Sequence, residues 1–171
     1  MTNLSTGASM KRLLMLFGAI GALGCAATSA REPAPGTVSA ADRAAVIVAV
    51  QTLFEAMRTR DTMALRAAFT PGAQLVSVRT VAGAPARFQT QPLAAFVTSV
   101  GRAPEELIER MWDPRVEIAG DLASLWAPYD FRIGVSFSHC GYDAVHLVRT
   151  SEGWKIAGIT YTVITTGCAP A

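Results

Sequence analysis

The chain has 171 residues, of which 51% are hydrophobic, and its 15 basic and 13 acidic side chains give a formal net charge of +2. Lys11 and Arg12 are the only charged residues before position 31, so the rest of the chain carries 13 charges of each sign. A neutral domain without a basic stripe is not expected to bind nucleic acid, and roughly 140 residues are enough for one domain with one core.

The first 30 residues have the pattern of an export signal. Lys11 and Arg12 precede an apolar run, Leu13–Gly24, that is too short to span a bilayer. Two processing sites are open: cleavage after Ala30 removes residues 1–30, whereas Ala22–Cys25 resembles a lipobox, in which residues 1–24 are removed and Cys25 is lipidated. Both predict an exported protein of the periplasm or outer envelope, attached to a membrane only through a lipid on Cys25.

A Pro/Gly-rich linker, residues 31–38, leads into one predicted domain, residues 39–168. Its two cysteines, Cys140 and Cys168, are expected to form a disulfide in an oxidising compartment, provided that the chain turns back at Thr166-Gly167. With only two histidines and no CxxC spacing, neither a metal site nor a cofactor is expected.

Three helices are predicted in the first half of the domain. The first runs over Ala40–Thr59 after the cap Ser39, and the second follows the cap Asp61, includes Phe69 and stops at Pro71-Gly72. The third is expected to start after Thr90 and to run to about Val100. Between the second and third helices, the alternation of Gln74–Thr80 predicts a strand, followed by a loop and a short return strand at Arg87–Gln89.

The second half of the domain predicts long antiparallel strands. They cover residues 106–119 (bent at Asp113-Pro114), 122–135 (bent at Pro128), 141–150 and 154–165. A Ser-Glu-Gly turn joins the last two as a hairpin, with Val145 and Leu147 on its buried face. Helices followed by a strand meander make the fold class α+β.

This order of elements, with Ser138–Asp143 and Gly153–Ile156, resembles the NTF2-like (cystatin-like cone) superfamily, closest to its SnoaL-like and lumazine-binding branches. The resemblance covers residues 40–166 and is most specific from Trp126–Tyr129 onward. It implies three N-terminal helices packed on a strongly curved antiparallel sheet that encloses a conical pocket. Because this superfamily includes both enzymes and non-catalytic domains, and no catalytic set known for it is complete here, the resemblance does not name an activity.

Strand parity suggests which side chains face such a pocket. Asp143 shares its face with Val145 and Leu147, so it is a candidate general base; the alternative is an ion pair with Arg149 or Arg132. His139, in an expected Ser-His-Cys-Gly turn, is a candidate acid–base partner or a loop cap. Tyr129 is a candidate hydrogen-bond donor to a ligand or a core residue. The predicted pocket residues are Trp112, Tyr129, Phe131 and Asp143, and the catalytic candidates are Asp143, His139 and Tyr129.

Two functions are left open. The first is an exported, non-catalytic domain that binds a small apolar or aromatic ligand or a partner protein. The second is a dehydratase, isomerase or hydrolase that uses acid–base residues of the pocket. A shared closed pocket for Asp143 and either His139 or Tyr129 would favour the enzyme. A homodimer is expected through the outer face of the sheet, which carries Tyr142, His146 and Val148.

Overall fold

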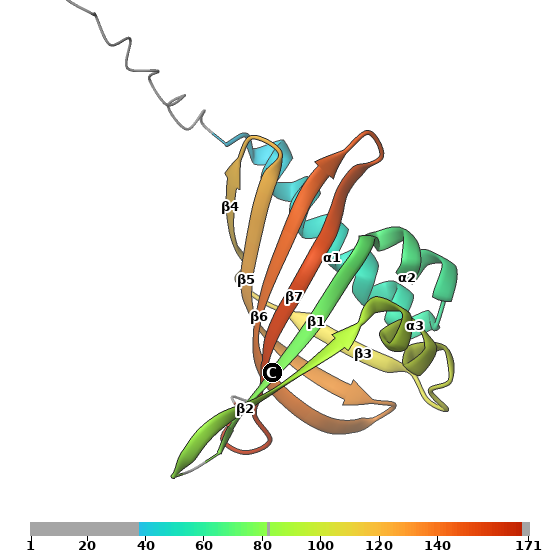
Figure 1. Ribbon diagram of the computed structural model, residues 1–171, viewed down its shortest axis with the longest axis vertical. Coiled ribbons are helices and arrows are strands. Elements are labelled where there is room, and N and C mark those ends of the chain that lie inside the picture. Colours follow the sequence, from blue (N-terminus) through green and yellow to red (C-terminus); the bar gives the residue numbers. More distant parts are fainter. Residues whose placement is uncertain (1–37, 82, 169–171) are drawn as a thin grey trace, which may run out of the picture. The chain divides into compact units, whose positions relative to one another are not determined.

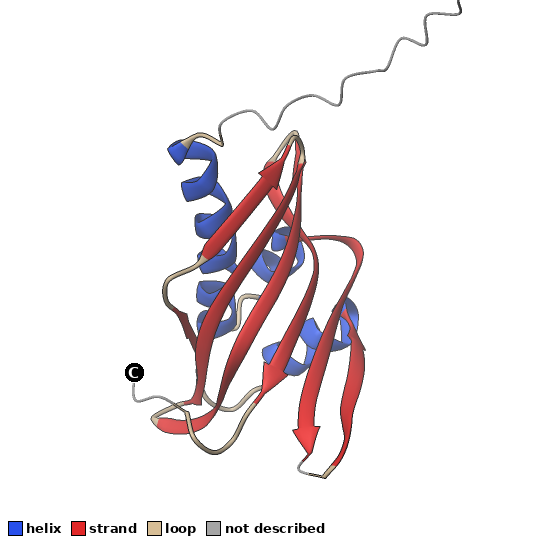
Figure 2. Cartoon of the chain, turned by 90° about the vertical axis from the view of Figure 1, so that its left-hand side faces the viewer, coloured by secondary structure: helices blue, strands red, loops and turns tan. Residues whose placement is uncertain are grey.

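The computed structural model describes residues 38–81 and 83–168, so the predicted export signal, both cleavage sites and Cys25 lie outside the described residues. Three helices lie against one strongly curved, open sheet (Figure 1). All three lie on the same side of it, the inner side, as the turned view in Figure 2 shows. None of the described helices is long and apolar enough to cross a membrane.

The first two helices begin where their capping residues predict. Helix α1 spans Ala40–Thr59, and the Ser39 hydroxyl accepts a hydrogen bond from the Asp42 amide at 2.9 Å. Helix α2 spans Thr62–Ala68, and Asp61 Oδ1 accepts hydrogen bonds from two amides of its first turn. The face of α1 that meets the sheet is apolar and buried; it comprises Val46, Val50, Leu53, Phe54 and Met57.

Helix α3 spans Leu93–Gly101 and corrects one prediction. Its capping position is Pro92, with no side-chain cap, and Thr90 instead pairs with Val76 inside a strand. The fixed φ of Pro92, −61°, joins an extended strand directly to a helix, so no hydroxyl cap is needed.

Seven strands form the sheet: β1 (Phe69–Val81), β2 (Ala84–Pro92), β3 (Leu107–Met111), β4 (Arg115–Ala119), β5 (Leu122–Ile133), β6 (Ser136–Thr150) and β7 (Gly153–Val163). Their order is β2-β1-β7-β6-β5-β3, and β4 also pairs with β5 beyond the bend that separates it from β3. All neighbours are antiparallel except β1 and β7, which run parallel. Phe69 begins β1 rather than ending α2, and the short return strand is the nine-residue β2.

The β6–β7 hairpin has the predicted turn and a register shift that was not predicted. Arg149 lies opposite Trp154, and Leu147 lies opposite Ile156. His146 then lies opposite Gly158, so Ala157 is an extra residue on β7, as in a β-bulge. Val145 and Leu147 are buried, as expected from their parity.

The C-terminal segment turns back onto β6. Cys140 pairs with Ile164, one residue further along than an unshifted hairpin would give, because of the extra residue in β7. Gly167 adopts a left-handed conformation with φ 75°, and Cys168 forms a disulfide with Cys140 at a Cα–Cα distance of 6.0 Å. The predicted disulfide and the predicted turn are therefore both present.

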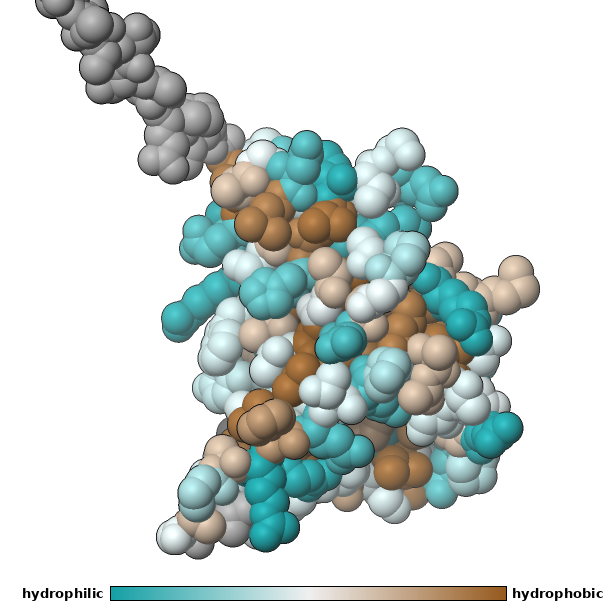
Figure 3. Space-filling view, in the orientation of Figure 1, coloured by the Kyte–Doolittle hydropathy of each residue, from teal (hydrophilic) through white to brown (hydrophobic). Residues whose placement is uncertain are grey.

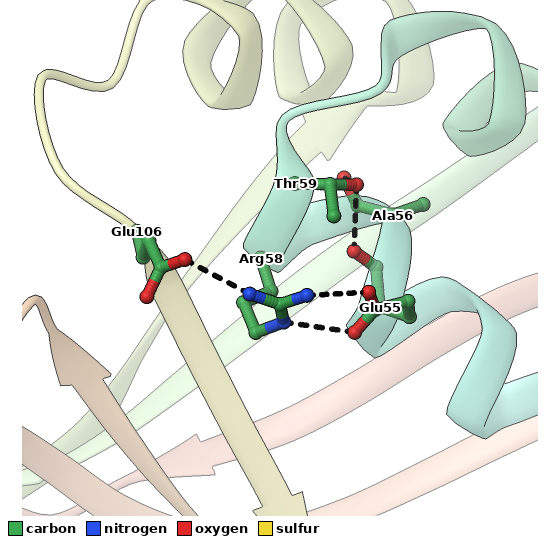
Figure 4. A network of polar contacts seen from close by, with 5 residues as sticks. All are labelled: Glu55, Ala56, Arg58, Thr59 and Glu106. Atoms are coloured by element: carbon green, nitrogen blue, oxygen red, sulfur yellow. Dashed lines mark hydrogen bonds and ion pairs between the residues drawn. The ribbon is translucent and has the colours of Figure 1, made fainter.

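Two arginines connect helix α1 to the sheet. Arg149 contacts Asp42 at 2.7 Å and Asp121 at 3.4 Å, and its guanidinium lies 4.3 Å from the centre of the Trp154 ring. At the other end of α1, Arg58 contacts Glu55 at 2.6 Å and Glu106 at 2.9 Å, just before β3 (Figure 4). These exposed ion pairs contribute little stability. The pair between Arg58 and Glu106 links the end of α1 to the residue before β3.

Candidate functional site

A cavity of about 280 Å³ lies between α1, α3 and the concave face of the sheet. Most of its wall is apolar, formed by Leu53, Met57, Leu75, Phe96, Val100, Leu107, Phe131 and Ile159. The polar side chains in its wall are Gln91, Ser99, Glu109, Tyr129, His139, Asp143 and Tyr161. Of the expected pocket residues, Tyr129, Phe131 and Asp143 line this cavity. Trp112 does not, because it lies in the bend between β3 and β4.

Two acidic side chains meet in this apolar cavity. The carboxyl groups of Glu109 from β3 and Asp143 from β6 lie close enough for one to donate a hydrogen bond to the other when it carries a proton. Asp143 is 3% exposed, and no amide, hydroxyl or guanidinium of the described residues donates to its Oδ2 atom. The alternative, an ion pair with Arg149 or Arg132, is not formed: Arg149 contacts Asp42 and Asp121, and Arg132 donates to the Val135 carbonyl oxygen.

Burial raises the pKa of both carboxyl groups of this acid pair. Desolvation raises the pKa of Asp143 to about 6, against the opposing effect of the hydrogen bond from Glu109. The pKa of Glu109 lies well above its ordinary value, first through desolvation of its carboxyl and then through the negative charge of Asp143. Within this pair the proton therefore lies preferentially on Glu109, which can donate a hydrogen bond to the Asp143 carboxylate.

Glu109 is the site residue that the sequence analysis missed. It lies between Leu107 and Met111 in β3, so all three share one face of a five-residue strand. The available signal was an acidic residue between two apolar residues that share its face. This signal is weak, because β3 is short and the sequence does not show where the strand ends before the bend at Asp113-Pro114. The pairing with Asp143 could not be read at all, since β3 and β6 are separated by β5 in the sheet.

Tyr129 is a structural residue in this site. Its side chain is 1% exposed, and its hydroxyl donates a hydrogen bond to the Thr162 carbonyl oxygen at 2.8 Å. The Thr162 hydroxyl in turn accepts from the Tyr142 amide at 2.8 Å, in place of the usual backbone carbonyl. The hydroxyl proton of Tyr129 is thus engaged, so of its two candidate roles, ligand donor or core residue, the arrangement fits the core residue.

A glycine makes this arrangement possible. Gly141 lies opposite Tyr129, between β5 and the Thr162 carbonyl on β7. A Cβ atom at Gly141 would lie 2.0 Å from the Thr162 carbonyl oxygen. The missing side chain therefore lets the Tyr129 hydroxyl reach across β6.

His139 lines the cavity but does not pair with Asp143. It lies within β6 and not in a turn, because this strand begins at Ser136. The two residues are four positions apart on the strand, roughly 13 Å at about 3.3 Å per residue. The His139 ring packs against Phe131, with ring centres 5.0 Å apart, and its Nδ1 lies 3.0 Å from the Ser138 hydroxyl. Burial and then the charge of Arg79 lower the pKa of His139, so its ring is neutral at neutral pH.

The outer face of the sheet carries exposed aromatic side chains. Trp126 is 48% exposed and stacks on Tyr142, which is 44% exposed, with ring centres 5.5 Å apart. Trp154, by contrast, is buried. On the face seen in Figure 3, the hydrophobic residues form separate patches with polar residues between them.

No metal-binding cluster of three or more His, Cys, Asp or Glu side chains occurs within residues 38–81 and 83–168. Around the acid pair, the polar side chains of the described cavity are those of Gln91, Ser99, Tyr129, His139 and Tyr161.

Comparisons with known proteins identify the fold. The sequence matches no protein-family model and no curated protein. Among solved structures, a proposed dehydratase of the NTF2-like family from Streptomyces avermitilis matches with a TM-score of 0.55 and 19% identity, over 72% of this chain and 96% of the other. An NTF2-like protein with a cystatin-like fold from Novosphingobium aromaticivorans matches with a TM-score of 0.58 and 14% identity, over 75% and 85%.

A third solved structure, an NTF2-like protein from Cytophaga hutchinsonii, matches with a TM-score of 0.59 and 12% identity, over 71% of this chain and 98% of the other. Similarities at identities this low show the fold and do not show an activity. They do not single out the SnoaL-like branch, which stays a prediction. The domain has the NTF2-like, cystatin-like fold that its sequence resembles.

Proposed function

We propose that the domain binds a small, largely apolar organic molecule in the conical cavity and catalyses proton transfer on it, in the manner of a dehydratase or isomerase. Asp143 is the general base and Glu109 the general acid. The observation that carries this proposal is the pair of carboxyl groups that face each other in a largely apolar cavity, where burial raises the pKa of both.

The acid pair is costly to the fold, which supports a chemical role. A buried carboxylate without donors from amide or hydroxyl groups destabilises the folded state, and Asp143 is such a group. A cavity that only binds an apolar molecule gains nothing from it. Perturbed pairs of titratable groups in a cleft are concentrated at catalytic sites.

The reaction follows from the two protonation states. The Asp143 carboxylate takes a proton from a carbon next to a carbonyl group, and the electron pair of that C–H bond forms a C=C bond. In a dehydration, Glu109 gives its proton to the departing hydroxyl, which leaves as water. The proton on Asp143 then passes through the hydrogen bond to Glu109 and restores the starting state. In an isomerisation, the proton is returned to a different carbon.

Non-catalytic ligand binding is the second candidate, and two observations favour it. The Tyr129 hydroxyl is engaged by Thr162, and His139 is too far along β6 to assist Asp143. Only the two carboxyl groups are thus left for chemistry. The proposed dehydratase from Streptomyces avermitilis, which has the same fold, supports the catalytic candidate as a class.

We also propose that the domain works outside the cytoplasm. The Cys140–Cys168 disulfide supports this, because cytoplasmic thiols are kept reduced. This proposal is tested by mass spectrometry, under non-reducing conditions, of the protein purified from its native host. Two free thiols in that material would contradict it, and the mass of the N-terminal peptide distinguishes Arg31 from a lipidated Cys25.

Isotope exchange tests catalysis without knowledge of the natural substrate. A panel of cyclic ketones and β-hydroxy carbonyl compounds is incubated with the mature domain in D₂O, and NMR follows deuterium uptake next to the carbonyl and loss of water. Asp143→Asn should slow any observed reaction roughly 100-fold or more. The matched control is Glu117→Gln, an exposed acid on β4. Compounds that bind wild type but react no faster than in buffer would favour the non-catalytic candidate.

A further inference from the structure

A second, polar chamber adjoins the cavity. It has a volume of about 180 Å³ and is lined by Ser77, Arg79, Gln89, Gln91, His139, Tyr161 and Val163. Three of these residues, Gln91, His139 and Tyr161, also line the cavity, so the two spaces share a wall. The polar chamber is lined by hydrogen-bond donors and a guanidinium and has no acidic side chain, in contrast to the acid pair of the cavity.

Two arginines lie side by side on the β1–β2 hairpin, and one of them, Arg79, lines this chamber. Arg79 is directly opposite Arg87 in the antiparallel register, so their side chains share a face with Ser77 and Gln89. Neither arginine makes an ion pair with an acidic side chain of the described residues. Like charges placed opposite each other are destabilising, and an anion between them would remove that repulsion. In Figure 3, hydrophilic residues gather at the lower left, toward the end of the molecule where Figure 1 places this hairpin.

The sheet register sets the distance from Arg79 to the acid pair. Ser77, Tyr161 and Asp143 are successive partners across β1, β7 and β6, so they form one row. Arg79 lies two residues beyond Ser77 on β1. With about 4.8 Å between strands and about 3.3 Å per residue, the Cα atoms of Arg79 and Asp143 are roughly 12 Å apart. A molecule with a short apolar body spans this distance.

We infer that the ligand is amphipathic: its apolar body occupies the cavity beside Asp143 and Glu109, and an anionic end group, a carboxylate or phosphate monoester, binds Arg79 in the polar chamber and Arg87 opposite it on the hairpin. This inference rests on the proposed function for the location of the ligand. The negative charge of Asp143 excludes an anion from the inner end of the cavity, and the guanidinium groups attract one at the outer end. The pair of arginines therefore sets the direction in which the ligand enters and which of its carbons meets Asp143.

Matched acid and amide probes test the anion site. Calorimetry of the mature domain compares benzoate, cinnamate and 5-phenylpenta-2,4-dienoate with their primary amides, which have the same shape without the charge. We expect at least one acid to bind roughly ten-fold or more tightly than its amide, since hydrogen bonds to a charged partner are about twice as strong as neutral ones. 2-Phenylethyl phosphate, compared with 2-phenylethanol, distinguishes a phosphate-binding site from a carboxylate-binding one.

Arg79→Gln and Arg87→Gln should each reduce this preference and leave the affinity for the amides unchanged. The control is Arg115→Gln, an exposed arginine of β4 on a different part of the sheet, which should keep the full preference. Equal affinities of wild type for acid and amide, or a preference that survives both substitutions, would overturn the anion site and leave the cavity function intact. Failure of every acid and amide to bind would contradict the proposed function itself, and the anion site with it.

Discussion

Asp143 gives the domain a pH-dependent stability that can be measured directly. Its pKa is about 6 in the folded state, against an ordinary value of 3.8. Below pH 3.8 the carboxyl is neutral in both the folded and the unfolded chain, so burying it does not require the desolvation of a charge. As the pH rises through about 6, the buried carboxyl ionises at a cost that the unfolded chain does not have. The folded state is therefore destabilised on the alkaline side of this range.

The size of the effect follows from the two pKa values. Their difference of about two pH units corresponds to roughly 3 kcal/mol in the free energy of unfolding. The substitution Asp143→Asn keeps the shape of the side chain and removes its titration. Relative to wild type, the variant should gain roughly 2.4 kcal/mol of stability between pH 4 and pH 7, whatever its stability at pH 4, because the carboxyl of the unfolded chain is already about half ionised at pH 4.

Urea unfolding of the mature domain with its disulfide intact, at pH 4, 5, 6 and 7, measures this difference. Subtracting the wild-type curve from the variant curve removes the titration of every group that does not interact with Asp143, which leaves Asp143 and its neighbour Glu109. Glu117→Gln controls for the loss of one negative charge. A difference between Asp143→Asn and wild type that does not change with pH would refute the argument, because it would mean that Asp143 titrates normally in the folded state.

Further predictions concern the core, the sheet and its outer face. Leu147→Ala should cost ~2–5 kcal/mol of stability because this side chain is fully buried; a loss well below 1 kcal/mol would mean that the strand parity is inverted. Gly141→Ala should lower the free energy of unfolding by a similar amount, since its Cβ would collide with the Thr162 carbonyl. A near-zero change would show that β7 can shift to make room for the methyl group. Tyr129→Phe leaves that carbonyl without its donor and should cost about 1–3 kcal/mol; no loss would mean that water replaces the hydroxyl. We propose a homodimer through the outer face, which sedimentation at micromolar concentration should show for wild type but not for Tyr142→Glu; a monomeric wild type would rule it out.

The parts of the fold that depend on local signals could be predicted from the sequence. The cap at Ser39 and the periodicity of the following residues predict α1 with the bounds that it has. Strand parity placed Asp143, Val145 and Leu147 on the buried face, because a sheet with one covered side repeats every two residues. The disulfide was predictable because two cysteines remain once Cys25 is assigned to the export signal.

The parts of the site that depend on curvature and register could not be predicted. The acid pair joins residues of β3 and β6, and only the strong curl of the sheet brings Glu109 to Asp143. Likewise, the extra residue at Ala157 has no signature in the sequence, yet it shifts every later pair of the β6–β7 hairpin by one position. His139 and Asp143 do share a face, but parity says nothing about the distance between them.

The contacts of Arg149 hold one end of the domain together more firmly than the other. This side chain joins the start of α1, the β4–β5 turn and the β6–β7 turn, all at the upper end in Figure 1. At the opposite end, β2 is an edge strand with exposed side chains, held by β1 alone along its length. We therefore expect backbone amides of the β6–β7 hairpin to exchange slowly with solvent and those of the outer half of β2 to exchange fast. The edge formed by β2 is therefore the part of the sheet that we expect to yield most readily, while the contacts of Arg149 keep the opposite end in register.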